Sequence, residues 1–172
     1  MKTAIIIHGM PSKEEYYDPK RRAASRHHFL PWLQRQLILN DVLTQVPEMP
    51  APYAPDYKKW EKVFEQFKLD KETILIGHSC GAGFLVRYLS EHKMNIAKLV
   101  LIAPWLDPHN ELESKMFSFD IDSELTKRCN QIVMVYSTDD DNEMILSIDI
   151  LNKKLPGVSA VKFSDKGHFT FD

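Results

Sequence analysis

Hydrophobic and polar positions along the chain form two alternating kinds of segment. Short runs made almost entirely of apolar residues are typical of strands buried on both faces of a parallel sheet. Segments whose apolar side chains recur three and four positions apart are typical of helices that pack one side on a sheet. The short runs predict strands at residues 3–7, 42–46, 73–76, 97–102, 132–136 and 158–163. The periodic segments predict helices that begin near Pro31, at Tyr57 (to Leu69), at Ala82 and at Met144 (to Leu155).

The remaining segments predict loops. Residues 10–28 are polar and have no clear period, and residues 106–128 are charged, with room for one or two short helices. Several prolines between residues 47 and 55 cannot continue a strand or a helix, which predicts a loop rather than a domain linker. Buried strands separated by amphipathic helices imply parallel crossovers. We therefore expect a three-layer α/β/α sandwich with a mostly parallel central sheet, built by residues 1–172 as a single domain.

Length and charge narrow the class of protein. A chain of 172 residues is close to the usual size of one domain, about 150 residues. The 22 basic and 24 acidic residues give a formal net charge of −2, which argues against a nucleic-acid partner. No apolar run approaches the roughly 18 residues of a membrane span, and the run at the N-terminus is too short for a secretory signal. Two cysteines cannot build a disulfide framework, so we expect a cytoplasmic protein without a membrane partner.

The most informative motif is Gly77-His78-Ser79-Cys80-Gly81. It has the form G-x-S-x-G, and it lies between a predicted strand and a predicted helix, as the motif requires. The glycines permit a sharp, strained turn that raises the serine hydroxyl above the sheet. The start of the helix then favours a developing negative charge. A structural glycine-rich turn is the alternative, but the motif and its context together favour Ser79 as a nucleophile.

A nucleophilic serine needs a base, and the base needs an acid that orients it. In the order typical of this motif, the acid follows a later strand and a histidine lies near the C-terminus. Asp139, Asp140 and Asp141 follow the predicted strand 132–136, and His168 follows the strand 158–163. We favour Asp140 over Asp139 as the acid. The aspartate run is also compatible with a solvated turn that caps the next helix.

The other histidines show no metal-binding pattern. None is spaced with Cys, Asp or Glu as in a zinc site, so we expect neither a metal nor another cofactor. His8 and His78 lie next to the expected site, and we expect them to support it rather than to act in it.

These motifs together resemble the small serine hydrolases of the retinoblastoma-binding-protein-nine type. The shared features are His8-Gly9 after the first strand, the turn around Ser79, the sequence Ser137-Thr138-Asp139-Asp140, and the terminal Lys166-Gly167-His168-Phe169. The resemblance implies a compact α/β-hydrolase fold without a large lid. It also implies that the second aspartate of the Ser-Thr-Asp-Asp pattern, Asp140, is the triad acid.

The chain departs from this family in two ways. Family members usually continue into a final helix, whereas four residues follow His168, and a missing helix would expose sheet surface. Asp141 stands where the family often has proline, which adds a negative charge near the predicted acid.

The resemblance implies two-step acyl transfer on a small ester, amide or thioester. His168 would accept the proton of Ser79, and Asp140 would hold the imidazole. The backbone N–H groups of Met10 and Cys80 would form the oxyanion hole. Trp105 follows a strand, and both an acyl-pocket wall and a core position suit it.

A protein-interaction module with little turnover is the competing hypothesis. The Leu-x-Cys-x-Glu motif that binds retinoblastoma-type proteins is absent, and no other motif indicates a protein partner. The complete set of serine, acid and histidine favours an enzyme with a small-molecule acyl substrate. A thioesterase or an acyltransferase would use the same residues.

Overall fold

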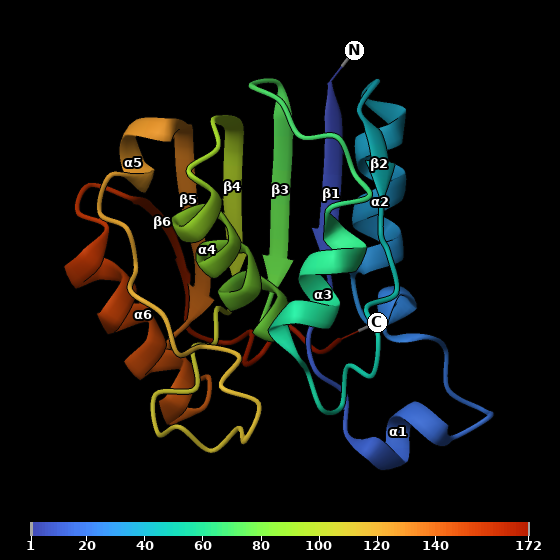
Figure 1. Cartoon of the computed structure of the whole chain (residues 1–172). Coiled ribbons are helices and arrows are strands. Elements are labelled where there is room, and N and C mark those ends of the chain that lie inside the picture. The colour runs from blue at the N-terminus through green and yellow to red at the C-terminus, as the bar shows by residue number, and fades with distance from the viewer. Residues whose placement is uncertain (1, 172) are drawn as a thin grey trace.

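A parallel sheet forms the centre of the molecule (Figure 1). The computed structural model describes residues 2–171. Within this range six strands pair in the order β2-β1-β3-β4-β5-β6, and every pairing is parallel. The strands are β1 (Thr3–Ile7), β2 (Leu43–Gln45), β3 (Thr73–His78), β4 (Ile96–Ile102), β5 (Cys129–Ser137) and β6 (Ser159–Phe163). The predicted α/β fold is confirmed, and each expected strand is present within a few residues of its predicted bounds.

Helices lie on both faces of the sheet (Figure 1). The helices are α1 (Lys13–Tyr17), α2 (Leu30–Leu39), α3 (Tyr57–Phe64), α4 (Cys80–His92), α5 (Leu125–Arg128) and α6 (Asn142–Lys154), with a 3₁₀ turn at Ala24–Arg26. Helix α3 ends at Phe64 rather than at the predicted Leu69, because the chain turns there and the N–H of Phe67 bonds the carbonyl of Phe64. Among the described residues, no helix is long and apolar enough to cross a membrane.

Two hydrophobic clusters bind the helices to the sheet. One cluster joins α3, α4 and α6 to side chains such as Ile5 and Leu75. The other joins α2 to the opposite face, where Ile6 and Ile76 point. Neighbouring strand residues therefore bury alternate faces, which explains why these strands are apolar throughout.

The turn between β3 and α4 is unusually tight. Ser79 has φ 54° and ψ −122°, and its N–H donates to the carbonyl of Ile102 on β4. A Cβ atom on Gly81 would lie 2.4 Å from the carbonyl oxygens of Ile7 and His8. Only glycine allows the first turn of α4 to approach the end of β1 so closely.

The Gly81→Ala substitution therefore destabilises the fold by about 3 kcal/mol, because the added methyl group overlaps backbone that cannot move away. Gly157 is the matched control: its φ is 81°, but a Cβ there meets nothing within 4 Å. The Gly157→Ala substitution costs about 1 kcal/mol through backbone strain alone. Urea denaturation of both variants measures the difference, and equal losses would contradict the close approach at Gly81.

Two buried histidines lie at the carboxyl ends of β1 and β3. His8 donates from Nδ1 to the carbonyl of Gly9 (2.7 Å), and its Nε2 accepts from the N–H of Met49 (2.9 Å). His78 donates from Nε2 to the carbonyl of His168 (2.9 Å). Burial is the main cause that lowers the pKa of both imidazoles, that of His78 to about 3. Both side chains are therefore neutral at pH 7.

Acid should weaken the fold through these histidines. Between pH 7 and pH 5 the unfolded chain binds a proton at His78, whereas the folded chain does not until about pH 3. The free energy of unfolding therefore falls by about 2 kcal/mol through His78 alone as the pH decreases to 5. Denaturant titrations at both pH values should show a smaller loss for His78→Asn than for the native chain. The exposed His109 is the control, and if His78→Asn behaves as His109→Asn does, the interpretation is wrong.

Candidate active site

The three residues of the predicted triad meet at the carboxyl edge of the sheet. Ser79 lies between β3 and α4, Asp140 follows β5, and His168 follows β6. The Nε2 atom of His168 is 2.9 Å from Oγ of Ser79, a residue 89 positions away in the chain. The Nδ1 atom of His168 is 3.0 and 3.1 Å from the two carboxylate oxygens of Asp140. The fold thus brings the three predicted residues into one continuous chain of hydrogen bonds.

The two candidate aspartates have different contacts. Both oxygens of Asp140 face His168, and its side chain is completely buried. Asp139 instead accepts hydrogen bonds from the hydroxyl of Ser137 and from the N–H of Gly167 (3.0 Å). These two bonds hold the pKa of Asp139 below its usual value. Asp139 therefore fastens the loop that carries the histidine, and Asp140 contacts the histidine itself.

Asp141, which departs from the family pattern, is exposed and occupies the position before the first turn of α6, where its side chain makes no capping hydrogen bond. Its N–H donates to Oδ1 of Asp140 at 2.7 Å, so its backbone supports the orientation of the neighbouring carboxylate.

Ser79 occupies the position before the first turn of α4, but its hydroxyl does not cap that helix. A serine at such a position ordinarily accepts a hydrogen bond from an N–H of the first helical turn. Here the strained backbone turns Oγ toward His168 instead. The first N–H groups of the helix are thereby left for another acceptor, and the helix dipole makes that acceptor's negative charge favourable.

The two residues expected to form the oxyanion hole are Cys80, which follows Ser79 in the chain, and Met10, which comes from the loop after β1. Cys80 is the first residue of α4, so its N–H has no acceptor within the helix. Burial raises the pKa of the Cys80 thiol, which therefore stays protonated and unreactive. Met10 lines the same cavity as Ser79. The residue before Met10 also lies close to the serine: a Cβ on Gly9 would be 3.1 Å from Cβ of Ser79.

Trp105 does not line the cavity at Ser79, so the structure supports its core position rather than the acyl-pocket alternative. The residue is 7% exposed, its Nε1 donates to Glu143 (2.7 Å), and its ring makes an edge-to-face contact with that of Phe117. Its backbone N–H, however, donates to the carbonyl of Ser79 at 3.2 Å. Trp105 thus contributes to the site by holding the backbone of the serine.

A cavity of about 380 Å³ opens beside Ser79 and His168. One part of its wall comes from the segment of residues 10–28, which contributes Arg21, His27 and His28. Apart from Met10, this segment was not predicted to line the site, because it lacks a hydrophobic period. Two signals were present: the cluster of basic residues at 20–28, and the Ser12-x-x-Glu15 pattern that caps α1.

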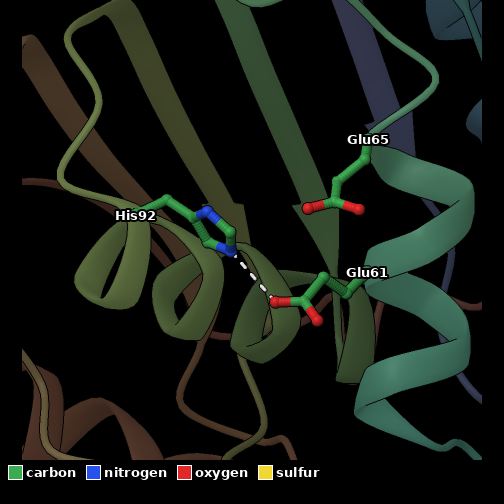
Figure 2. A group of neighbouring side chains, drawn as sticks. All are labelled: Glu61, Glu65 and His92. Atoms are coloured by element: carbon green, nitrogen blue, oxygen red, sulfur yellow. Dashed lines mark hydrogen bonds and ion pairs between the residues drawn. The ribbon is translucent and has the colours of Figure 1, made fainter.

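Among residues 2–171, one group of side chains lies close enough together to share a metal ion. It consists of Glu61, Glu65 and His92 (Figure 2). Nε2 of His92 is 3.0 Å from one oxygen of Glu61, and Nζ of Lys58 is 2.8 Å from the other. The carboxylate of Glu61 is therefore already neutralised. The group joins α3 to the carboxyl end of α4, whereas Ser79 precedes the other end of α4. Glu61, His92 and Lys58 have the arrangement of a surface ion pair.

Comparisons with known proteins identify the family. The model of the family described as serine aminopeptidase, S33, matches residues 28–146. The putative hydrolase YdeN of Bacillus subtilis (strain 168) is 32% identical over 93 residues, which cover 53% of this chain and 43% of YdeN. The serine hydrolase RBBP9 of Rattus norvegicus is 34% identical over 130 residues, which cover 70% of this chain and 66% of RBBP9. The chain thus matches less than two thirds of the length of each relative.

Solved structures show the same fold. The ydeN gene product of Bacillus subtilis superimposes with a TM-score of 0.82 at 21% identity, over 98% of this chain and 88% of that chain. Est1E from Butyrivibrio proteoclasticus gives a TM-score of 0.69 at 15% identity, over 98% and 80% of the two chains. The resemblance first drawn from the motifs is confirmed. The chain belongs to the serine aminopeptidase S33 family and has the α/β-hydrolase fold.

Proposed function

We propose that the protein cleaves small carboxylic esters, and by the same chemistry amides or thioesters, through a triad of Ser79, His168 and Asp140. The observation that carries the proposal is the position of His168. One ring nitrogen lies 2.9 Å from the hydroxyl of Ser79, and the other lies 3.0 Å from the carboxylate of Asp140. These are the distances of a nucleophile, a base and an orienting acid that act together.

The reaction begins when Oγ of Ser79 attacks the substrate carbonyl and its proton passes to Nε2 of His168. Asp140 accepts the hydrogen bond from Nδ1–H and stabilises the imidazolium that forms. The N–H groups of Cys80 and Met10 stabilise the negative oxygen of the tetrahedral intermediate.

The leaving group then departs with the proton of His168, and an acyl-Ser79 intermediate remains. Water attacks this acyl group as His168 accepts a proton again, which releases the carboxylic acid and restores the hydroxyl of Ser79.

The cavity supports a small substrate. Its volume of about 380 Å³ lies at the lower end of the range for small-molecule pockets, roughly 300–1,000 Å³. The buried Cys80 thiol cannot replace the serine as nucleophile, because its raised pKa keeps it protonated.

Exposure to a fluorophosphonate tests whether Ser79 is activated. Intact mass spectrometry should show one adduct on the native chain and none on Ser79→Ala. The exposed Ser114 is the matched control, and Ser114→Ala should be labelled as the native chain is. Turnover of an activated ester should fall by about 10⁴-fold or more in Ser79→Ala. A well-folded native chain that forms no adduct would refute the proposal and favour the interaction-module hypothesis.

The two aspartates should differ strongly in their effect on rate. Asp140→Asn should lower kcat by about 10⁴-fold, because an amide cannot hold the imidazole in the required tautomer. Asp139→Asn should cost less than about tenfold, because its amide oxygen can still accept from Gly167 and Ser137. Steady-state kinetics on one activated ester compare the two variants. Equal or reversed losses would show that Asp140 is not the triad acid.

A further inference from the structure

The cavity beside Ser79 has a basic wall. Arg21, His27 and His28 line it together with Ser79 and His168. A second hollow of about 260 Å³ shares Arg21 and both histidines with the first. This second hollow adds three more cationic side chains, Lys20, Arg22 and Arg26. Four cations thus gather at one side of the candidate active site, although the whole chain has a formal net charge of −2.

Few negative charges oppose these cations. Among the described residues that line the two hollows, Glu15 has the only carboxylate. It lies 3.9 Å from Nη2 of Arg21, beyond hydrogen-bond distance, and both side chains are about half exposed. One oxygen of Glu15 is also engaged by the N–H of Ser12, in the capping box of α1. Arg21 is therefore only weakly neutralised.

Two further carboxylates near this wall, those of Glu48 and Asp18, are bound to backbone. Glu48 accepts from the N–H groups of Ala24 (3.1 Å) and Ser25 (2.7 Å). Asp18 accepts from the N–H of Lys20 at 2.9 Å. These bonds hold the chain of the basic segment in place, and neither carboxylate lines the hollows.

The geometry points to a substrate that carries a negative charge: an ester, amide or thioester whose acyl or leaving group bears a carboxylate held by Arg21. This inference rests on the proposed function of Ser79. A guanidinium group fits a carboxylate with two parallel hydrogen bonds. A cleft lined by one sign of charge also raises the local concentration of a ligand with the opposite charge. Arg21 is thus assigned as a specificity-determining residue.

Two matched pairs of esters test this inference. In the first pair the charge is on the acyl side: 4-nitrophenyl hemiglutarate is compared with its methyl ester. In the second pair it is on the leaving side: 4-butyryloxybenzoate is compared with its methyl ester. In at least one pair, kcat/KM of the native chain should be about tenfold higher for the anionic ester. This preference should shrink when NaCl is raised from about 0.02 M to about 0.5 M, because salt screens exposed charges.

Substitutions on the basic wall should change this preference in opposite directions. Arg21→Gln should lower the ratio of anionic to neutral kcat/KM about tenfold, mainly through KM, because it removes a charged hydrogen bond used in binding. Glu15→Gln should raise the ratio, because glutamine keeps the capping box but loses the opposing charge. Arg35, exposed on α2 and outside both hollows, is the matched control, and Arg35→Gln should leave the ratio unchanged.

The outcomes separate the inference from the proposed function. If a fluorophosphonate does not label Ser79, the proposed function fails and the inference fails with it. If Ser79 is labelled but neither pair shows a preference for the anionic ester, the inference alone is overturned. The inference alone is also overturned if neither salt nor Glu15→Gln changes the preference. This outcome can be read even if the Arg21→Gln variant does not fold.

Discussion

The position of Ser79 depends on how closely the start of α4 approaches the sheet. The Gly81 backbone lies against the carbonyl groups at the end of β1. The backbone of Ser79 is held on two further sides, since its N–H bonds the carbonyl of Ile102 and its carbonyl accepts from the N–H of Trp105. A serine with a positive φ is unfavourable in isolation, and these contacts from the end of β1 and from residues 102–105 offset its cost. The hydroxyl therefore remains directed at His168 instead of turning to cap the helix.

The positions of the proposed base, His168, and the proposed acid, Asp140, depend on the pairing of the last two strands. β5 and β6 run parallel up to the pair Ser137 and Phe163, so the loops after both strands begin at the same level. The hydroxyl of Ser137 accepts from the N–H of Lys166, and Asp139 accepts from the N–H of Gly167. His78 at the end of β3 binds the carbonyl of His168. The histidine loop is thus tied both to the loop of the acid and to the strand that precedes the nucleophile.

How much of this could be predicted from the sequence depended on how local each feature is. The buried strands follow from short apolar runs, and the turn at Ser79 follows from one five-residue motif. Asp140 and His168 directly follow two of these strands, so the fold and the meeting of the three residues were predictable. Helix α1 was not predicted, although its Ser12–Glu15 capping box is equally local, because its five residues bury no side chain and have no hydrophobic period. The position of the basic residues 20–28 beside Ser79, and the pair of Glu61 and His92, arise from chain segments that only the folded structure brings together. For Trp105 a strand-end position suits both a core and a pocket, and only its burial away from the cavity at Ser79 distinguishes them.

The reacting groups and the basic wall lie on parts of the molecule with different constraints. Ser79, Asp140 and His168 follow three strands of one sheet, β3, β5 and β6. A shift of any one of these strands would separate its residue from the other two. Arg21 lies in an exposed segment that is joined to the rest of the chain by capping and backbone bonds, including those of Glu48. A carboxylate held by Arg21 would belong to a part of the substrate that does not react, so we expect this contact to act on the ground state and the transition state alike. We therefore expect that changes in residues 20–28 alter which substrates bind while the geometry of the reacting groups is preserved. Changes at the strand ends alter the chemical step for every substrate.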